Sequence, residues 1–168
     1  MRAIRYIVVL MSVAAMWAST GCSQVERPEQ AQAAEKLSPE AFLHDHLPSQ
    51  SVVTVAEAYR AMVMLAEGQD QFNSFGGREE YLLSRQITRP EWKLQRDMAI
   101  DRGSVAYMVM RIIGIRGGVN SNVFGRLGIA DRRYAVRELA YRDIMTNAPP
   151  YRLISGPELV DLMGKADA

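Results

Sequence analysis

The stretch TVAEAYRAMVMLAEG, residues 54–68, predicts an amphipathic helix and decides the fold class of the chain. Thr54 offers an N-cap hydroxyl, and Glu57 follows at the spacing of a capping box. The apolar residues of one helical face recur at the expected spacing: Ala58, Met62 and Leu65. Gly68 is a typical C-terminal stop. We therefore expect a helix with one buried face over these residues.

Four more segments share this helical periodicity and are separated by residues rich in Gly, Pro and Asn. They are residues 78–86, 101–113, 131–145 and 155–163. Residues 114–128 carry five glycines and are predicted to form a loop. No run alternates β-branched and polar residues as strands do. The sequence therefore predicts an all-α domain in which short and long helices alternate.

The three helices predicted to be long share a pattern. Thr54, Asp101 and Ser155 each place a capping oxygen at the start, at spacings of 47 and 54 residues. Apolar residues follow four and eight positions later in every copy: Ala58 and Met62, Val105 and Val109, Leu159 and Met163. Self-similarity at this period is typical of a repeated module that stacks its helices into one core.

This alternation resembles the S-layer homology (SLH) family over residues 52–166. The nearest likenesses are DRGSVAYMVMRIIGI at 101–115, YAVRELAYRDIM at 134–145 and ISGPELVDLM at 154–163. In that family the long helix begins with a Thr-Arg-Ala-Glu box, whose Arg and Glu help to form grooves for anionic cell-wall polymers. The three helix starts here read TVAE, DRGS and SGPE, so none has the complete box. The resemblance implies SLH-like internal repeats and a polymer-binding surface.

The N-terminus has the order of a secretory signal peptide, with Arg2 and Arg5, a 13-residue apolar run and then small residues. A membrane-spanning helix needs roughly 20 apolar residues, so the run is too short for one. The sequence STGC at 19–22 resembles the lipobox of bacterial lipoproteins, with Ser19 in place of the usual Leu. The alternative is an ordinary signal peptide with an incidental cysteine.

The lipoprotein resemblance implies that Cys22 is lipidated, becomes the new N-terminus and is acylated on its amine, so that the protein is exported and membrane-bound. By the sorting rule of that class, Ser23 directs it to the outer membrane. Cys22 is the only cysteine, so the exported domain forms no internal disulfide. We divide the chain into a signal peptide (1–21), lipidated Cys and flexible tether (22–38), short helix or linker (39–51) and helical SLH-like domain (52–168).

The tether prediction rests on composition, because residues 23–38 (SQVERPEQAQAAEKLS) contain almost no large apolar side chain. The short helix that follows is predicted to begin at Ser38, which precedes Pro39 as an N-cap does. His44, Asp45 and His46 lie beyond it. We expect this cluster to be solvated rather than to bind a metal, because the chain has no third His and no spare Cys.

The charge of the chain is close to zero, with 20 basic and 19 acidic residues. Loss of residues 1–21 would remove two arginines and change the formal charge from +1 to −1. A body this close to neutral argues against binding nucleic acid through bulk charge. Arginine nevertheless supplies 17 of the 20 basic residues, and its planar fork suits carboxylate or phosphate ligands.

Eight arginines lie between positions 102 and 142. We predict an anion site from the arginines and the loop glycines of this region: Arg111, Arg116, Gly117, Gly118 and Arg126. The alternative is a solvated face of ion pairs, because Asp101, Asp131, Glu138 and Asp143 are interleaved with the arginines.

Catalytic motifs are missing from the sequence. It has no GxSxG, no HExxH and no phosphate-binding loop that ends in Gly-Lys-Ser/Thr. We therefore expect a non-catalytic binding module without cofactor, attached to the membrane by lipid and directed at cell-wall polymer or an envelope protein. Two alternatives stay open: an enzyme or enzyme accessory acting on cell-wall material, and a structural subunit of an envelope assembly.

Overall fold

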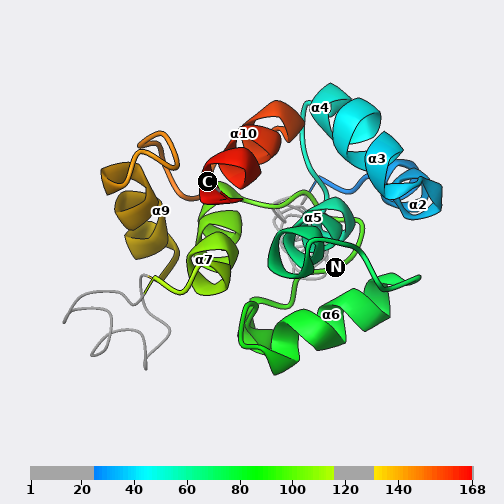
Figure 1. The fold of residues 1–168 in the computed structure, drawn as a ribbon, viewed down its shortest axis with the longest axis horizontal. Coiled ribbons are helices and arrows are strands. Elements are labelled where there is room, and N and C mark those ends of the chain that lie inside the picture. Colours follow the sequence, from blue (N-terminus) through cyan, green and yellow to red (C-terminus); the bar gives the residue numbers. More distant parts are fainter. Residues whose placement is uncertain (1–24, 116–130, 168) are drawn as a thin grey trace, which may run out of the picture.

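The computed structural model describes residues 25–115 and 131–167, and within these ranges it contains helices and isolated bridges but no strand (Figure 1). The predicted all-α class is confirmed. The helices are α2 (Pro28–Lys36), α3 (Pro39–Ala41), α4 (Leu47–Ser49), α5 (Val55–Glu67), α6 (Phe75–Ser84), α7 (Arg102–Ile112), α9 (Asp131–Tyr141) and α10 (Gly156–Asp167). A π-helical turn, η1 (Phe42–His46), and a 3₁₀ turn, η2 (Pro90–Trp92), complete them.

The predicted caps of α5 and α7 lie where the sequence places them. Thr54 and Glu57 form the complete capping box of α5, and Gly68 ends that helix in the left-handed conformation at φ 73°. Asp101 caps α7 by accepting a hydrogen bond from the backbone N–H of Ser104. Cap positions were predictable because a cap depends on residues three apart in the chain.

Helix boundaries further from the caps differ from the prediction. α6 begins at Phe75 rather than Arg78, since Ser74 caps it through the N–H of Gly77. α10 continues beyond Gly164 to Asp167. The helices are consequently more similar in length than the predicted alternation, with 13 residues in α5, 10 in α6, 11 in α7 and in α9, and 12 in α10.

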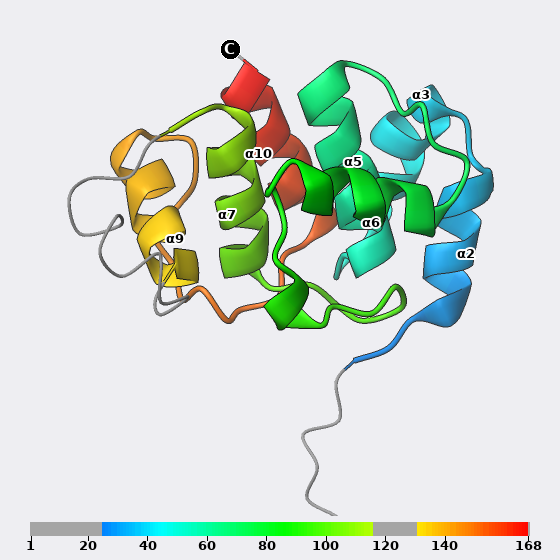
Figure 2. The ribbon, with the colours of Figure 1, turned by 90° about the horizontal axis from the view of Figure 1, so that it is seen from below.

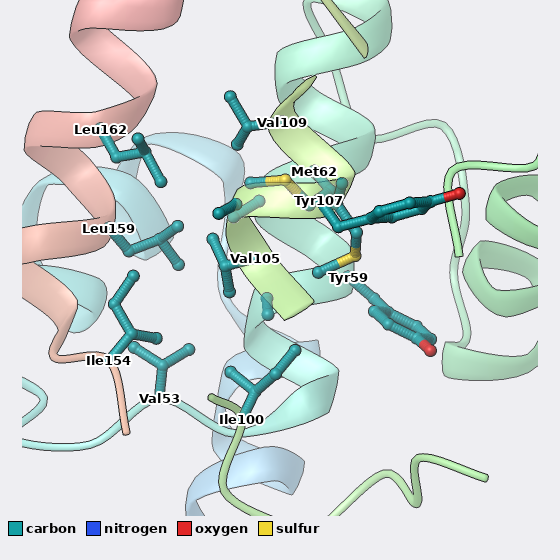
Figure 3. Close-up of a cluster of buried hydrophobic side chains, with 14 of the residues drawn as sticks. Val53, Tyr59, Met62, Ile100, Val105, Tyr107, Val109, Ile154, Leu159 and Leu162 are labelled. Atoms are coloured by element: carbon teal, nitrogen blue, oxygen red, sulfur yellow. The ribbon is translucent and has the colours of Figure 1, made fainter. Parts of the chain in front are cut away.

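Three extended segments meet in a closed ring of backbone hydrogen bonds. Ile100 N–H donates to Val53 C=O (3.0 Å), Ile154 N–H to Ile100 C=O (3.2 Å), and Val53 N–H to Ile154 C=O (3.0 Å). Each of these residues immediately precedes the cap of α5, α7 or α10, and their side chains gather at one end of the core (Figure 3). The three helices with the shared sequence pattern therefore start from one common ring.

The first turn of each of these helices is bonded to the segment before another of them. The N–H groups of Val55, Arg102 and Gly156 donate at 2.8 Å to the carbonyls of Met98, Arg152 and Gln50, respectively. These N–H groups have no partner within their own helix, so the contacts satisfy buried donors. The third contact requires glycine, because a Cβ on Gly156 would lie 1.6 Å from the Leu47 carbonyl oxygen.

The core lies between the helices that leave the ring. α5 and α7 are neighbours at the centre, α6 packs on α5, α9 on α7, and α10 on α4 (Figure 1). Ala58, Val105 and Leu159, the first apolar position of each copy, are fully buried. At the second position Met62 and Val109 are also fully buried, whereas Met163 is only partly buried and its neighbour Leu162 enters the core (Figure 3).

The flexible tether predicted over residues 22–38 is wrong for residues 25–38, since residues 25–27 are bonded to residues 97–99 and a helix follows them. α2 occupies this segment and packs on α5, with Ala31 fully buried and Ala34 1% exposed. Its short alanine side chains let the two helices approach closely, and Gln30 and Glu35 add polar contacts to the rest of the domain. Composition missed the helix because alanine buries little area by itself and gains its packing from the partner helix.

Residues 39–51 also belong to the domain rather than to a linker. Phe42 in η1 and Leu47 in α4 are fully buried in the same core as α5 and α7. Within the described ranges, no helix is both long and apolar enough to cross a membrane.

Candidate functional site

Two arginines are buried in a cluster around Asp70, which follows α5. Arg60 of α5 donates from Nε to Asp70 at 2.9 Å, and Arg78 of α6 donates from Nη2 to the same carboxylate at 2.8 Å. Arg60 also donates to the carbonyls of Ala34 and Leu37 near the end of α2. Burial lowers the pKa of Arg60, and the charge of Asp70 opposes this effect. The cluster joins α2, α5 and α6, and its arginines are 4% and 1% exposed.

Arg102 is the third buried arginine and lies at the first position of α7, where the SLH box has its Arg. Its guanidinium pairs with Glu158 of α10 and donates to the Thr146 carbonyl at 2.6 Å. Burial lowers the pKa of Arg102, while the charge of Glu158 raises it. The side chain is completely buried. Arg102 therefore connects α7 to α10 and is not accessible to a polymer.

His46 from the predicted His-Asp-His cluster is part of a buried hydrogen-bond network. Its Nε2 lies 2.6 Å from the carboxylate of Glu57, which also accepts from Gln30 Nε2 at 2.7 Å and from the Thr54 backbone at 2.8 Å. His44 points to solvent. In the part of the chain that the structure describes, no group of three or more His, Cys, Asp or Glu residues is arranged to hold a metal ion.

Arg111 is the one described member of the predicted anion site. It lines a pocket of about 360 Å³ between α6, η2 and α7 and donates from Nε to the Gln86 carbonyl at 3.1 Å. Glu91 lines the same pocket, and Arg89 pairs with Asp131 at 2.7 Å. Burial raises the pKa of Asp131 even though Arg89 opposes it. Acidic groups thus offset much of the positive charge here.

A second groove, of about 460 Å³, lies between α9 and residues 147–151. α9 contributes Arg133 and Arg137, which are both exposed. The facing segment contributes Asn147 and Tyr151, and Tyr151 is 74% exposed. The remaining lining residues are Val136, Ala148, Pro149 and Pro150. We call this the α9 groove.

The two arginines of the α9 groove are four residues apart and therefore lie on one face of the helix. Neither forms an ion pair or a side-chain hydrogen bond with any residue in the described ranges. Arg142, the residue after α9, is different, because it pairs with Glu138 at 2.9 Å. The groove thus combines two guanidinium groups, an amide and an exposed aromatic ring. This combination suits a ligand with carboxylate or phosphate groups on a sugar-like scaffold.

The structure separates the arginines that the sequence grouped. The pocket that Arg111 lines and the α9 groove have no lining residue in common. The other predicted site residues, Cys22, Arg116, Gly117, Gly118 and Arg126, lie outside the described residues. Sequence reasoning did not single out Arg133 and Arg137. A usable signal existed, because neither has an acidic residue three or four positions away on the helix.

A comparison of the chain with protein-family models, curated proteins and solved structures finds no match. The fold and the site therefore define the protein as a small all-α domain with three ring-linked helices and an arginine groove on its surface.

Proposed function

We propose that this protein is a lipid-anchored protein of the cell envelope whose helical domain binds an acidic cell-wall polymer noncovalently through the α9 groove. The observation that carries the proposal is the pair Arg133 and Arg137, two exposed guanidinium groups without a carboxylate partner in the described ranges. Two like charges four residues apart repel each other, so a ligand with two negative charges would offset this repulsion when it binds.

The envelope location rests on the sequence STGC at 19–22 and on the signal-peptide order before it. Two or three acyl chains on Cys22 would give firm membrane attachment, whereas one chain binds only marginally. The SLH resemblance of residues 52–166 adds support for a wall-polymer ligand. The proposed binding surface is nevertheless the α9 groove, since Arg102 at the box position is buried.

Retention on isolated sacculi tests the binding site. Full-length protein is extracted in mild detergent and pelleted with sacculi, with wild type compared with Arg133→Gln/Arg137→Gln. We expect about tenfold less retention of the double variant, because a hydrogen bond to a charged group contributes roughly 1.5–3 kcal/mol. Arg142→Gln, directly after α9, is the matched control, since Arg142 is already paired with Glu138. Polygalacturonate should compete as a soluble polyacid.

Equal retention of the double variant and wild type would remove the α9 groove from the proposal. Release of muropeptides in the same assay would support the enzyme alternative. Stoichiometric co-purification of an envelope protein, without retention on sacculi, would instead support a structural subunit.

The anchor has its own test. Cys22→Ala should abolish incorporation of labelled palmitate and leave the leader uncleaved by the lipoprotein signal peptidase. Palmitate labelling of the Cys22→Ala protein would end the lipoprotein proposal. Cys22 is the only cysteine, so the substitution has no competing site of S-acylation.

A further inference from the structure

The folded part of the chain begins very close to Cys22. Val25 C=O accepts from Ala99 N–H at 2.8 Å, Glu26 forms a bridge with Met98, and Arg27 N–H donates to Asp97 C=O at 2.7 Å. These residues therefore already lie beside residues 97–99, which lead into the ring. In the sequence, residues 23 and 24 alone separate Cys22 from Val25.

Contacts of α2 hold this N-terminal segment in place. Gln30 Nε2 donates at 2.7 Å to Glu57, which is fully buried, and Glu35 pairs with Arg96 at 2.9 Å. Arg60 bonds to the Ala34 carbonyl at the other end of the helix. Releasing α2 to lengthen the connection would leave these buried polar groups without their partners, which is unfavourable.

The reach of the connection is therefore small. Three peptide units between Cys22 and Val25 span at most about 10 Å, at roughly 3.3–3.6 Å per residue. The 13 residues of α5 alone extend about 20 Å at 1.5 Å per residue. A domain on so short a connection stays beside the surface that holds its anchor.

The end of the molecule that holds the ring also exposes apolar side chains. Val25 is 44% exposed and Leu153 is 36% exposed, and they are two of four large apolar residues exposed in the described ranges. Val25 is bonded to Ala99, and Leu153 forms a bridge with Asp101, so both border the ring. The start of α2 and the segment entering α10 lie on the lower edge of Figure 2, and the C-terminal end of α10 lies on the upper edge.

We propose that this ring end, formed by Val25–Arg27, residues 93–99 and Leu153, rests on the phospholipid headgroups of the membrane that holds Cys22. The inference depends on the proposed lipidation of Cys22. Val25 and Leu153 face the headgroup region, and the exposed Lys93 offers a positive charge to anionic lipid. The long helices then point away from the bilayer, and the domain binds its polymer close to the membrane.

Energy transfer to labelled lipid tests this orientation with the full-length lipidated protein. The protein is reconstituted in phosphatidylethanolamine–phosphatidylglycerol vesicles that contain an acceptor-labelled lipid. A donor is attached at Gln95→Cys, at the ring end, or at Lys165→Cys in the last turns of α10. The native cysteine is acylated, so the introduced cysteine is the one free thiol. We expect at least about twofold higher transfer from position 95 than from 165, because transfer falls steeply with distance.

A matched variant carries a 16-residue Gly/Ser insertion after Ser23. It should lower transfer from position 95 by at least about twofold, since the connection then reaches several tens of ångströms. The orientation would be overturned if transfer from position 95 were equal to or lower than transfer from position 165, or if the insertion changed nothing. Palmitate labelling in the same protein would still support the lipid anchor. Loss of palmitate labelling and of vesicle flotation would overturn the anchor and the orientation together.

Discussion

The buried arginines and the groove arginines of this domain have the same side chain in two opposite settings. Arg60 and Arg78 share the carboxylate of Asp70 in the interior, and each also donates to backbone carbonyls. Arg133 and Arg137 lie on the surface of α9 without such partners in the described ranges. A buried guanidinium paired with a carboxylate and backbone carbonyls holds helices together. One that is exposed and unpaired is available to a ligand.

This difference shows why an excess of arginine does not by itself locate a binding site. Burial removes the hydration of a charge, so a buried arginine is tolerated only where the protein supplies carboxylates and carbonyls around it. On the surface, water replaces those partners at little cost. Substitutions should therefore separate the two groups by their effect on stability.

The largest effect is expected for Asp70→Ala. Its carboxylate is 3% exposed and accepts hydrogen bonds from both Arg60 and Arg78, so removing it takes the shared partner from two buried cations. We expect the free energy of unfolding to fall by about 3–5 kcal/mol. Urea denaturation followed by far-UV circular dichroism measures this loss. Asp161→Ala is the surface control and should change it by less than about 0.5 kcal/mol, because its pair with Lys165 is exposed. A loss below about 1 kcal/mol for Asp70→Ala would contradict the role of Asp70 as the shared partner of the two buried arginines.

The second effect depends on pH. It tests whether the buried tyrosine Tyr59 or the buried arginines limit the stability of the domain at alkaline pH. Burial, with the nearby charge of Glu79, raises the pKa of Tyr59 to about 12. In the unfolded chain Tyr59 ionises near pH 10. Its contribution to the free energy of unfolding is therefore constant below that pH and falls as the pH rises towards 12, by roughly 3 kcal/mol in all.

Urea denaturation at pH 9, 10 and 11 should show the fall in wild type and a smaller fall in Tyr59→Phe; the remainder includes the contribution of Tyr81, whose pKa is also raised by burial and by its hydrogen bond to Glu67. Tyr151→Phe, at an exposed position, should keep the wild-type pH dependence. An unchanged pH dependence in Tyr59→Phe would assign the alkaline loss to other groups, the buried arginines among them.

A smaller effect is expected for Arg102→Met, which keeps the volume of the side chain but not its charge. We expect a loss of about 2 kcal/mol, since Glu158 and the Thr146 carbonyl lose a charged partner. Glu158 retains Arg152 at 2.7 Å, which limits the cost. The same substitution should cost less in a Glu158→Gln background, and additive costs would show that the pair is not coupled. Arg111→Met is the exposed control.

The smallest effect is expected for Arg133→Gln/Arg137→Gln. Removing two like charges four residues apart should change the free energy of unfolding by at most about 0.5 kcal/mol, in the stabilising direction. The same urea titration measures it, at low and at high salt, where screening should reduce the gain. A loss above about 1 kcal/mol would place these arginines with the buried group and weaken the binding proposal.

The parts of the fold that depend on neighbouring residues were predictable. Thr54 and Asp101 act as caps as expected, and the apolar positions that follow them are buried. α2 was not predictable in the same way. Its Ala31 and Ala34 are buried only because α5 lies against them, which no local pattern of short side chains indicates.

The candidate site, like the fold, was predictable only where it depends on residues close together in the chain. The sequence indicated an arginine-rich region between 102 and 142, and the α9 groove lies partly in it. It did not distinguish Arg102, which is fully buried, from Arg133, which is exposed. Pairing of residues four apart can be predicted from their spacing, as for Arg142 and Glu138, but the pairing of Arg102 with Glu158 joins residues 56 positions apart.

The sequence by itself determined the all-α class, the starts of the three repeated helices and the apolar faces that they bury. Capping and helical periodicity act over a few residues, so these features are written locally. Tertiary structure alone decided the ring that joins Val53, Ile100 and Ile154, the inclusion of α2 in the domain and the division of the arginines into buried and exposed groups. These features depend on contacts between residues that are far apart in the sequence. Such residues exclude water from each other only once the chain has folded.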